Sequence, residues 1–477
     1  MKRFLYTIIA LALSIGTQAA RHRTDATSSQ SDSVPQTVKS HLKQHYRVYG
    51  FVRNYFAYDS RESLSGIGDL YYYQPKDENW NQTETEAALS GVPREDLNAQ
   101  STFRFLSLTT RIGLDILDYK WRGTEFGGKL EADFYAGLNN VGSGTHKLSG
   151  TALIRLRLAY MTLAWDSLWF NDRDFARIDL LLGQAWHPMA ADLSDAIALN
   201  SGAPFGPFSR TPQVTMNARL GRYVTLTGAA LWQMQYTSIG PNGQSADYIA
   251  YSKTPEAYLG LSFHDRGFLL RAGADLLSIK PRQTGTMNGV QVKVSDRITT
   301  CSPYLYLQYA TGEFSIKAKS IFAQAGEHMN LNGGYGVTAI NADGSYSYTP
   351  TRNSSSWISI VYGGKVGAQV DRHPQKLQGI LFGGYMQNFG TREALLDANG
   401  DGEADMFYYP RLSNLNRMWR LTPTIVWSIG KFQLGCEYEI TSAQYGDGKI
   451  SAQNGLSENR LHWVTNHRVQ LMTKYNF

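Results

Sequence analysis

The sequence predicts an all-β protein: a transmembrane, up-and-down, antiparallel β-barrel of about sixteen strands, with short periplasmic turns and long outer loops. Three observations predict it. Apolar and polar residues alternate with a period of two from about residue 46, the connections alternate between short and long, and the first residues have the composition of an export signal. The 29 Tyr and 45 Gly among 477 residues also favour strands and tight turns over helices.

The N-terminal residues divide into two expected segments. Residues 1–19 combine basic Lys2 and Arg3 with a short apolar stretch and a small-residue cleavage site, so we expect a signal peptide. Residues 20–45 are polar and rich in Ser and Thr, which predicts a periplasmic linker before a barrel at 46–477. Loss of the signal lowers the formal charge from +6 to +4, a balance that gives no reason to expect a nucleic-acid partner.

Alternation within the segments predicts strands that have one polar and one apolar face. Lys129, Glu131 and Asp133 alternate with apolar residues, and so do Arg155 and Arg157. Two cysteines share parity with apolar neighbours, so we expect two separate outward-facing thiols at Cys301 and Cys436. About sixteen such segments lie near 46–58, 102–116, 124–138, 151–166, 174–187, 210–221, 223–238, 254–264, 266–281, 297–311, 313–324, 353–371, 375–390, 415–430, 431–445 and 459–477.

The connections between these segments are sorted by length. Those after even-numbered segments are short, such as Gly221-Arg222 and Ile429-Gly430-Lys431, whereas those after odd-numbered segments are long, such as 59–101 and 325–352. A barrel with both termini in the periplasm predicts this sorting, so we expect the outer membrane of a Gram-negative cell, with its lipid bilayer as a partner. The final strand ends on Phe477, which resembles the C-terminal signal of outer-membrane barrels.

Five stretches in the first 190 residues or so resemble the DcaP-like family of outer-membrane porins, in the same order as in that family. The resemblance implies a sixteen-stranded barrel, usually a homotrimer, that passes small negatively charged solutes. Residues 20–45 show no heptads, unlike the N-terminal coiled coil that family members often carry. The five stretches are Tyr49-Gly50-Phe51-Val52-Arg53, Arg111-Ile112-Gly113-Leu114, Lys129-Leu130-Glu131-Ala132-Asp133-Phe134, Arg155-Leu156-Arg157-Leu158-Ala159-Tyr160 and Leu182-Gly183-Gln184-Ala185-Trp186.

Basic residues outnumber acidic residues on the expected inner face. A barrel of this size is too wide for side chains to fill, so its lumen should be aqueous. Rings of Arg and Lys lower the entry barrier for anions, which predicts passive, anion-biased diffusion of small hydrophilic solutes such as carboxylates. A mixed wall without selectivity is the alternative. The expected pore-lining residues are Arg53, Arg111, Lys129, Glu131, Asp133, Arg155, Arg157, Arg271, Lys317 and Lys319.

The third long connection, residues 188–209, is the expected constriction. In many sixteen-stranded porins the third outer loop folds into the lumen, and this connection resembles it in position and length. Residues 190–199 are expected to form a short helix, and 203–208 a stiff apolar return; an outward-facing lid is the alternative. The expected constriction residues are Asp192, Asp195, Phe205 and Arg210.

An acidic stretch in a later outer loop has the spacing of a hard-cation site. Oxygen-bearing side chains occupy positions 1, 3, 5, 7 and 9, with Gly402 at position 6, as in the first part of an EF-hand loop. Tyr408 replaces the bidentate Glu at position 12. The sequence therefore predicts a weak Ca²⁺ site, or a turn-rich loop without an ion, and no other cofactor. The ligands would be Asp397, Asn399, Asp401, Glu403 and Asp405.

An enzyme is not expected, because the 10 His are scattered and none has a candidate nucleophile near it in the sequence. A structural or adhesive barrel, which binds partners through its long outer loops, is the alternative function.

Overall fold

The computed structural model describes residues 45–66, 71–107, 110–136, 152–166, 175–195, 202–367, 369, 373–409 and 413–477. The chain divides into two compact units, Met1–Gln44 and His45–Phe477, and all described residues belong to the second. The expected signal peptide and nearly all of the expected linker lie outside the described residues. In the described part of the chain, no helix is long and apolar enough to cross a membrane.

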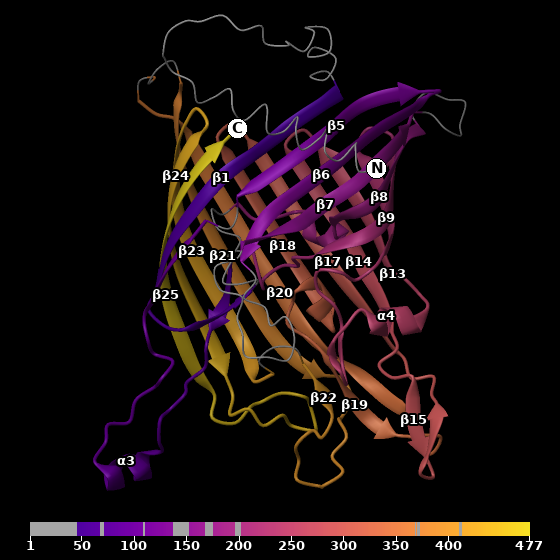
Figure 1. Cartoon of the computed structure of the whole chain (residues 1–477), viewed down its shortest axis with the longest axis vertical. Helices are drawn as coiled ribbons and strands as arrows, with labels where there is room; N and C mark the ends of the chain where they lie inside the picture. Colours follow the sequence, from indigo (N-terminus) through magenta and orange to yellow (C-terminus); the bar gives the residue numbers. More distant parts are fainter. Residues whose placement is uncertain are drawn as a thin grey trace, which may run out of the picture. The chain divides into compact units, whose positions relative to one another are not determined.

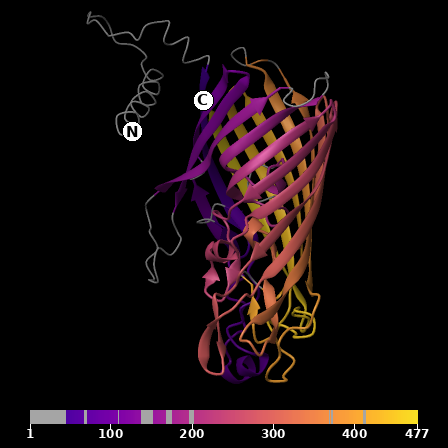
Figure 2. The ribbon, with the colours of Figure 1, turned by 90° about the vertical axis from the view of Figure 1, so that its right-hand side faces the viewer.

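The second unit is a closed antiparallel barrel of 16 strands (Figures 1 and 2). Each strand pairs with its neighbour in sequence, and β1 closes the sheet by pairing with both β25 and β5. The fold class predicted from the sequence is therefore confirmed. The wall strands are β1 (Tyr46–Asp59), β5 (Arg111–Trp121), β6 (Thr124–Ala136), β7 (Ala152–Trp165), β8 (Phe175–Trp186), β9 (Arg210–Leu220), β10 (Val224–Leu231), β13 (Glu256–Asp265), β14 (Phe268–Ile279), β17 (Ile298–Thr311), β18 (Phe314–Gln324), β20 (Tyr346–Lys365), β21 (Gln375–Thr391), β23 (Leu415–Ile429), β24 (Phe432–Tyr445) and β25 (His462–Asn476).

The remaining elements belong to the loops or extend the wall. α3 begins with a capping box between Thr83 and Glu86 and ends before the C-cap residue Gly91, whose φ of 67° suits glycine. Figure 1 shows α3, β15, β19 and β22 at the end of the barrel opposite the C-terminus. These elements are β2 (Ser63–Gly66), β3 (Tyr71–Pro75), α3 (Glu84–Ser90), β4 (Thr102–Leu106), η2 (Pro188–Ala190), β11 (Ile239–Gly240), β12 (Gly243–Gln244), α4 (Asp247–Ser252), β15 (Thr284–Met287), β16 (Val290–Lys293), η4 (Gly326–Met329), β19 (Tyr335–Ile340) and β22 (Phe407–Tyr408).

Three predicted segments differ clearly from the strands. The segment at 223–238 is too long, because β10 ends at Leu231. The segment at 102–116 is split into β4 and β5, and both halves pair with β1, so together they occupy one position in the wall. The segment at 353–371 begins earlier, at Tyr346, because β19 pairs with the first part of β20 beyond the wall. The alternation read from the sequence is thus interrupted between β4 and β5, and it is prolonged where the hairpin of β19 and β20 extends beyond the wall.

Side chains alternate between the two faces of the wall. Along β17, the exposed Leu305 (50%) follows the buried Tyr304 (5%) and precedes the buried Tyr306 (1%). Cys301 and Cys436 are both exposed and unbonded, which confirms the predicted parity of their strands. The outer face therefore presents a band of apolar side chains, as a membrane-facing barrel requires.

The first residues of β1 meet the last residues of β25 beside a short turn. The backbone N–H of Phe477 donates to the Gly50 carbonyl at 3.0 Å, and Asn476 N–H donates to Lys431 O at 2.9 Å. A Cβ on Gly50 would lie 2.4 Å from the Phe477 ring, so only glycine leaves room for this aromatic end. The C-terminal residue is thus packed on the first strand at the short-turn end.

Candidate pore constriction

A ladder of paired charges follows the inner face of β5, β6 and β7. We call Arg111, Glu131, Asp133, Arg155 and Arg157 the charge ladder. The antiparallel register places Asp133 between Arg111 and Arg155. Arg155 donates to both Asp133 oxygens, at 2.9 and 2.8 Å. This bidentate geometry fixes both the position and the orientation of the guanidinium.

Arg157 reaches two carboxylates because the strand pairing shifts beside it. Glu131 lies opposite Leu158 and Ala132 opposite Leu156, so Arg157 is the extra residue of a bulge. It donates to Glu131 at 2.7 Å and to Asp133 at 2.8 Å, and its side chain is only 2% exposed.

The ladder carries an excess of positive charge. Arg111 lies 3.5 Å from Glu131, so three arginines share two carboxylates. Beside them, Lys129 lies 3.0 Å from Asp115, which also pairs with Arg47. The ladder and the group of Arg47, Lys129 and Asp115 each carry a net charge of one cation. The remaining charges in each group are neutralised by ion pairs within the wall.

The third long loop contacts the inner wall. Asp192 pairs with Arg271 on β14, and Asp195 pairs with Lys317 on β18 at 2.8 Å. Lys319 on β18 donates to the backbone carbonyls of Met189 and Asp192, at 2.8 and 2.6 Å. The loop thus runs from β8 and β9 to β14 and β18, and its own carboxylates neutralise two of the expected pore-lining cations.

The returning part of this loop is apolar and packed. Phe205 is fully buried in a cluster with Trp357 and Phe382. A Cβ on Gly384 would lie 2.5 Å from the Phe205 ring, so β21 needs a glycine there for the loop to approach. Arg210, at the start of β9, donates to Gln235 at 3.0 Å and lies 4.9 Å from the centre of the Trp186 ring.

The predicted helix at 190–199 is wrong for the residues that the structure describes. Only Pro188–Ala190 form a short 3₁₀ turn, and residues 191–195 are not helical; 196–199 lie outside the described residues. The polar groups of this stretch form hydrogen bonds with the barrel wall, and these replace the hydrogen bonds that a helix would need. Asp195 N–H donates to Ser359 Oγ at 3.2 Å instead of to a carbonyl four residues earlier.

Two further loops turn inward, and the sequence reading missed both. Arg420 on β23, 1% exposed, donates to Ala203 O in the third loop at 3.0 Å and to Tyr73 O in β3 at 2.7 Å. Met329, in η4, accepts a hydrogen bond from Phe208 N–H at 2.9 Å. The only sequence signal for these contacts is Arg420 itself, a cation on the polar face of an alternating strand.

A cavity of about 230 Å³ lies against the third loop. Arg53 on β1 and Lys474 on β25 line it, together with Asp195 of the loop. Gln378 and Gln433 add neutral polar groups. The charged residues that line the cavity are thus two cations from the wall and one carboxylate that is already paired with Lys317. The rest of the lining is apolar: Val361, Ile380, Val426 and Met472.

The acidic loop at 397–405 is held by its own backbone. Asp397 accepts hydrogen bonds from the N–H groups of Gly400, Asp401 and Gly402, at 2.7, 3.1 and 2.9 Å. Asp405 accepts from Asn399 Nδ2 at 3.2 Å, and Glu403 pairs with Lys449. The loop is therefore ordered around Asp397, and Ca²⁺ binding there stays a prediction.

The fold matches solved structures over most of the chain. No family model and no curated protein sequence matches it. The outer-membrane channel DcaP of Acinetobacter baumannii is 17% identical, with a TM-score of 0.56, over 91% of this chain and 97% of that one. An anion-selective porin from Comamonas acidovorans is 11% identical (TM-score 0.46; 91% and 99% covered), and Salmonella typhi OmpF with daunomycin is 13% identical (0.44; 91% and 97%). The resemblance to DcaP-like porins is thus confirmed at the level of the fold.

Proposed function

We propose that this protein is an outer-membrane porin, without enzymatic activity, that gives small hydrophilic solutes such as carboxylates a passive, anion-biased path. We also propose that it is exported through its signal peptide and assembles as a homotrimer, as the resemblance to DcaP-like porins implies. The closed barrel, its apolar outer band and its charged inner face support a channel in a lipid bilayer.

The observation that carries the anion bias is the cavity against the third loop. Arg53 and Lys474 line it, and its one carboxylate, Asp195, is paired with Lys317. The charge ladder adds further positive charge on the same inner face. Such an excess acts over about one Debye length, roughly 8 Å at physiological salt, which is comparable to a narrowed passage.

The experiment is the zero-current potential of the purified protein in planar bilayers under a salt gradient. We expect anion preference in the wild type. The triple variant Arg111→Ala, Arg155→Ala, Arg157→Ala should move the potential toward cation preference, because two carboxylates then remain without their cations. A matched control, Lys253→Ala, Lys293→Ala, Lys449→Ala, removes three exposed loop cations and should shift the potential much less. A cation-selective wild type would contradict the proposal.

A structural or adhesive barrel is the second candidate, because loops occupy part of the interior. Tyr73, Ala203 and Phe208 form one buried apolar cluster, and Met189, Phe205 and Met329 belong to another that includes wall residues. Single-channel conductance separates the two functions. Discrete ohmic steps support the porin, whereas an intact barrel that never conducts supports the structural role.

A further inference from the structure

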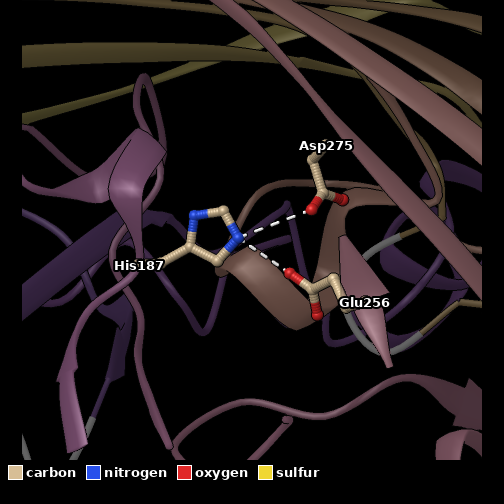
Figure 3. A group of neighbouring side chains, drawn as sticks. All are labelled: His187, Glu256 and Asp275. Atoms are coloured by element: carbon tan, nitrogen blue, oxygen red, sulfur yellow. Dashed lines mark hydrogen bonds and ion pairs between the residues drawn. The ribbon is translucent and has the colours of Figure 1, made fainter. Parts of the chain in front are cut away.

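Four titratable side chains meet where the root of the third loop, two wall strands and η4 come together. His187 follows β8, Glu256 begins β13, Asp275 lies on β14 and His328 lies in η4. All four are at most 2% exposed. Figure 3 shows the His187 ring pointing at both carboxylates.

The distances among these groups are those of atoms that share a proton or a cation. His187 Nε2 lies 2.7 Å from Glu256 Oε1 and 3.5 Å from Asp275 Oδ1. His328 Nε2 lies 3.3 Å from Asp275 Oδ2 and 3.7 Å from Glu256 Oε1. Ligand atoms around a tetrahedral Zn²⁺ with bonds of about 2.0–2.1 Å are separated by about 3.3 Å.

The two histidines are in different states. Met189 N–H donates to His187 Nδ1 at 3.1 Å, so that nitrogen carries no proton and Nε2–H donates to Glu256. A neutral ring with its proton on Nε2 has no lone pair there for a metal. His187 is therefore a hydrogen-bond donor that orients Glu256.

His328 has the opposite arrangement. Its Nδ1 lies 3.2 Å from the Ala325 carbonyl and must donate to it, which leaves Nε2 facing the two carboxylates. A metal-ligating histidine is typically held by this kind of bond from its other nitrogen. Two carboxylates face His328 Nε2, so the position between them attracts a positive charge.

The carboxylates have binding capacity left over. Glu256 Oε2 and Asp275 Oδ1 are buried and accept no hydrogen bond from the described residues. Within the same described part of the chain, neither carboxylate pairs with Arg or Lys. The two buried carboxylates therefore have no permanently charged partner there, and such a burial is costly unless a cation compensates it.

We propose that His328 Nε2, Glu256 and Asp275 bind a divalent first-row transition cation of the Zn²⁺ class, with His187 holding Glu256 in place. One imidazole and two carboxylates form a mixed nitrogen and oxygen donor set that suits such a cation. The ion would join η4 to β13 and β14. Because Met329 of η4 accepts from Phe208 N–H, it would also stiffen the third loop.

The test uses the full chain, freed of metal with a chelator, refolded into detergent and then given Zn²⁺. We expect about one Zn²⁺ per chain to remain after gel filtration. His328→Gln should lose the ion, whereas His187→Gln should retain it, because glutamine keeps an N–H donor for Glu256. His373→Gln, at an exposed position in a short turn, is the matched control and should bind like the wild type.

Two results would overturn the proposal: wild-type protein that shows the heat-modifiable gel mobility of a folded barrel but retains no Zn²⁺, or loss of the ion in His187→Gln but not in His328→Gln. Co²⁺ gives a readout that does not depend on any variant folding. Its visible spectrum in the wild type should show four-coordinate nitrogen and oxygen ligation, and the spectrum of the aqueous ion would count against the site.

Discussion

The two sides of the inner wall neutralise their cations in different ways. On β5, β6 and β7, the ladder arginines pair with carboxylates of neighbouring strands. On β14 and β18, Arg271 and Lys317 pair with Asp192 and Asp195 of the third loop. The first arrangement belongs to the barrel itself, whereas the second exists only while the loop is in place. The net charge that β5, β6 and β7 present to the lumen is thus fixed by the barrel. The net charge that β14 and β18 present depends on the position of the third loop.

Burial separates Arg157 from the loop pairs, whereas Arg155 and Arg111, 18% and 20% exposed, are about as accessible as Lys317. The Arg157 side chain is 2% exposed, as is its partner Asp133, whereas Arg271 and Lys317 are 32% and 20% exposed. Removing one partner of a buried pair leaves a desolvated charge, whereas a partly exposed pair contributes little. We therefore expect the loss of Arg157 to reduce stability more than the loss of a loop pair, whereas selectivity should respond to charge changes on both sides.

The largest expected effect comes from breaking the ladder at its most buried member. Arg157→Ala leaves Glu131 without its closest cation and Asp133 with Arg155 alone, which should lower the free energy of unfolding by about 3 kcal/mol. Arg219→Ala is the control, because Arg219 is 51% exposed and lies 3.8 Å from Asp179; it should cost less than about 1 kcal/mol. Urea unfolding in liposomes measures both, and equal losses would show that burial does not separate the two kinds of pair.

The next effect concerns the anchor between loops. Arg420→Ala removes the donor to both Tyr73 O and Ala203 O, so β3 and the third loop lose a common attachment. We expect a larger or noisier single-channel conductance while the barrel still forms. Arg417→Ala, on the same strand but exposed, should conduct like the wild type. An unchanged current in Arg420→Ala would mean that other contacts suffice to hold these loops.

A smaller and opposite effect is expected at the loop pairs. Asp192→Asn with Asp195→Asn removes two negative charges and leaves Arg271 and Lys317 without their ion-pair partners. The zero-current potential should then move toward stronger anion preference, the reverse of the shift expected for the ladder variant. A shift toward cations, or none, would imply that permeating ions do not pass the third loop near these residues.

The strands were predictable from the sequence because their signals are local. Period-two alternation places Arg111, Asp133 and Arg155 on one face. The short turns distinguish one end of the barrel from the end that carries the long loops. The loop contacts carry no such signal. Asp192 and Arg271 are 79 residues apart in the sequence. They meet only because of the path that the third loop takes across the interior. For the same reason, the sequence did not reveal the pairing of His187 with Glu256, or the inward position of β3.

The smallest expected effect lies in the outer loops, where a third arrangement occurs: Asp397 is satisfied by backbone N–H groups instead of by cations. If this loop wraps Ca²⁺, Asp397→Asn should weaken a site whose dissociation constant is about 0.1–1 mM, as in extracellular calcium modules.

Asp343→Asn is the matched control, because Asp343 also caps a turn, by accepting from Ser345 N–H at 2.9 Å, but lacks the repeated oxygen spacing. Calorimetric titration with Ca²⁺ measures the difference. Because the loop lies outside the wall strands, channel selectivity should stay the same in both variants. An identical Ca²⁺ response in wild type and Asp397→Asn would show that the carboxylate serves the backbone alone.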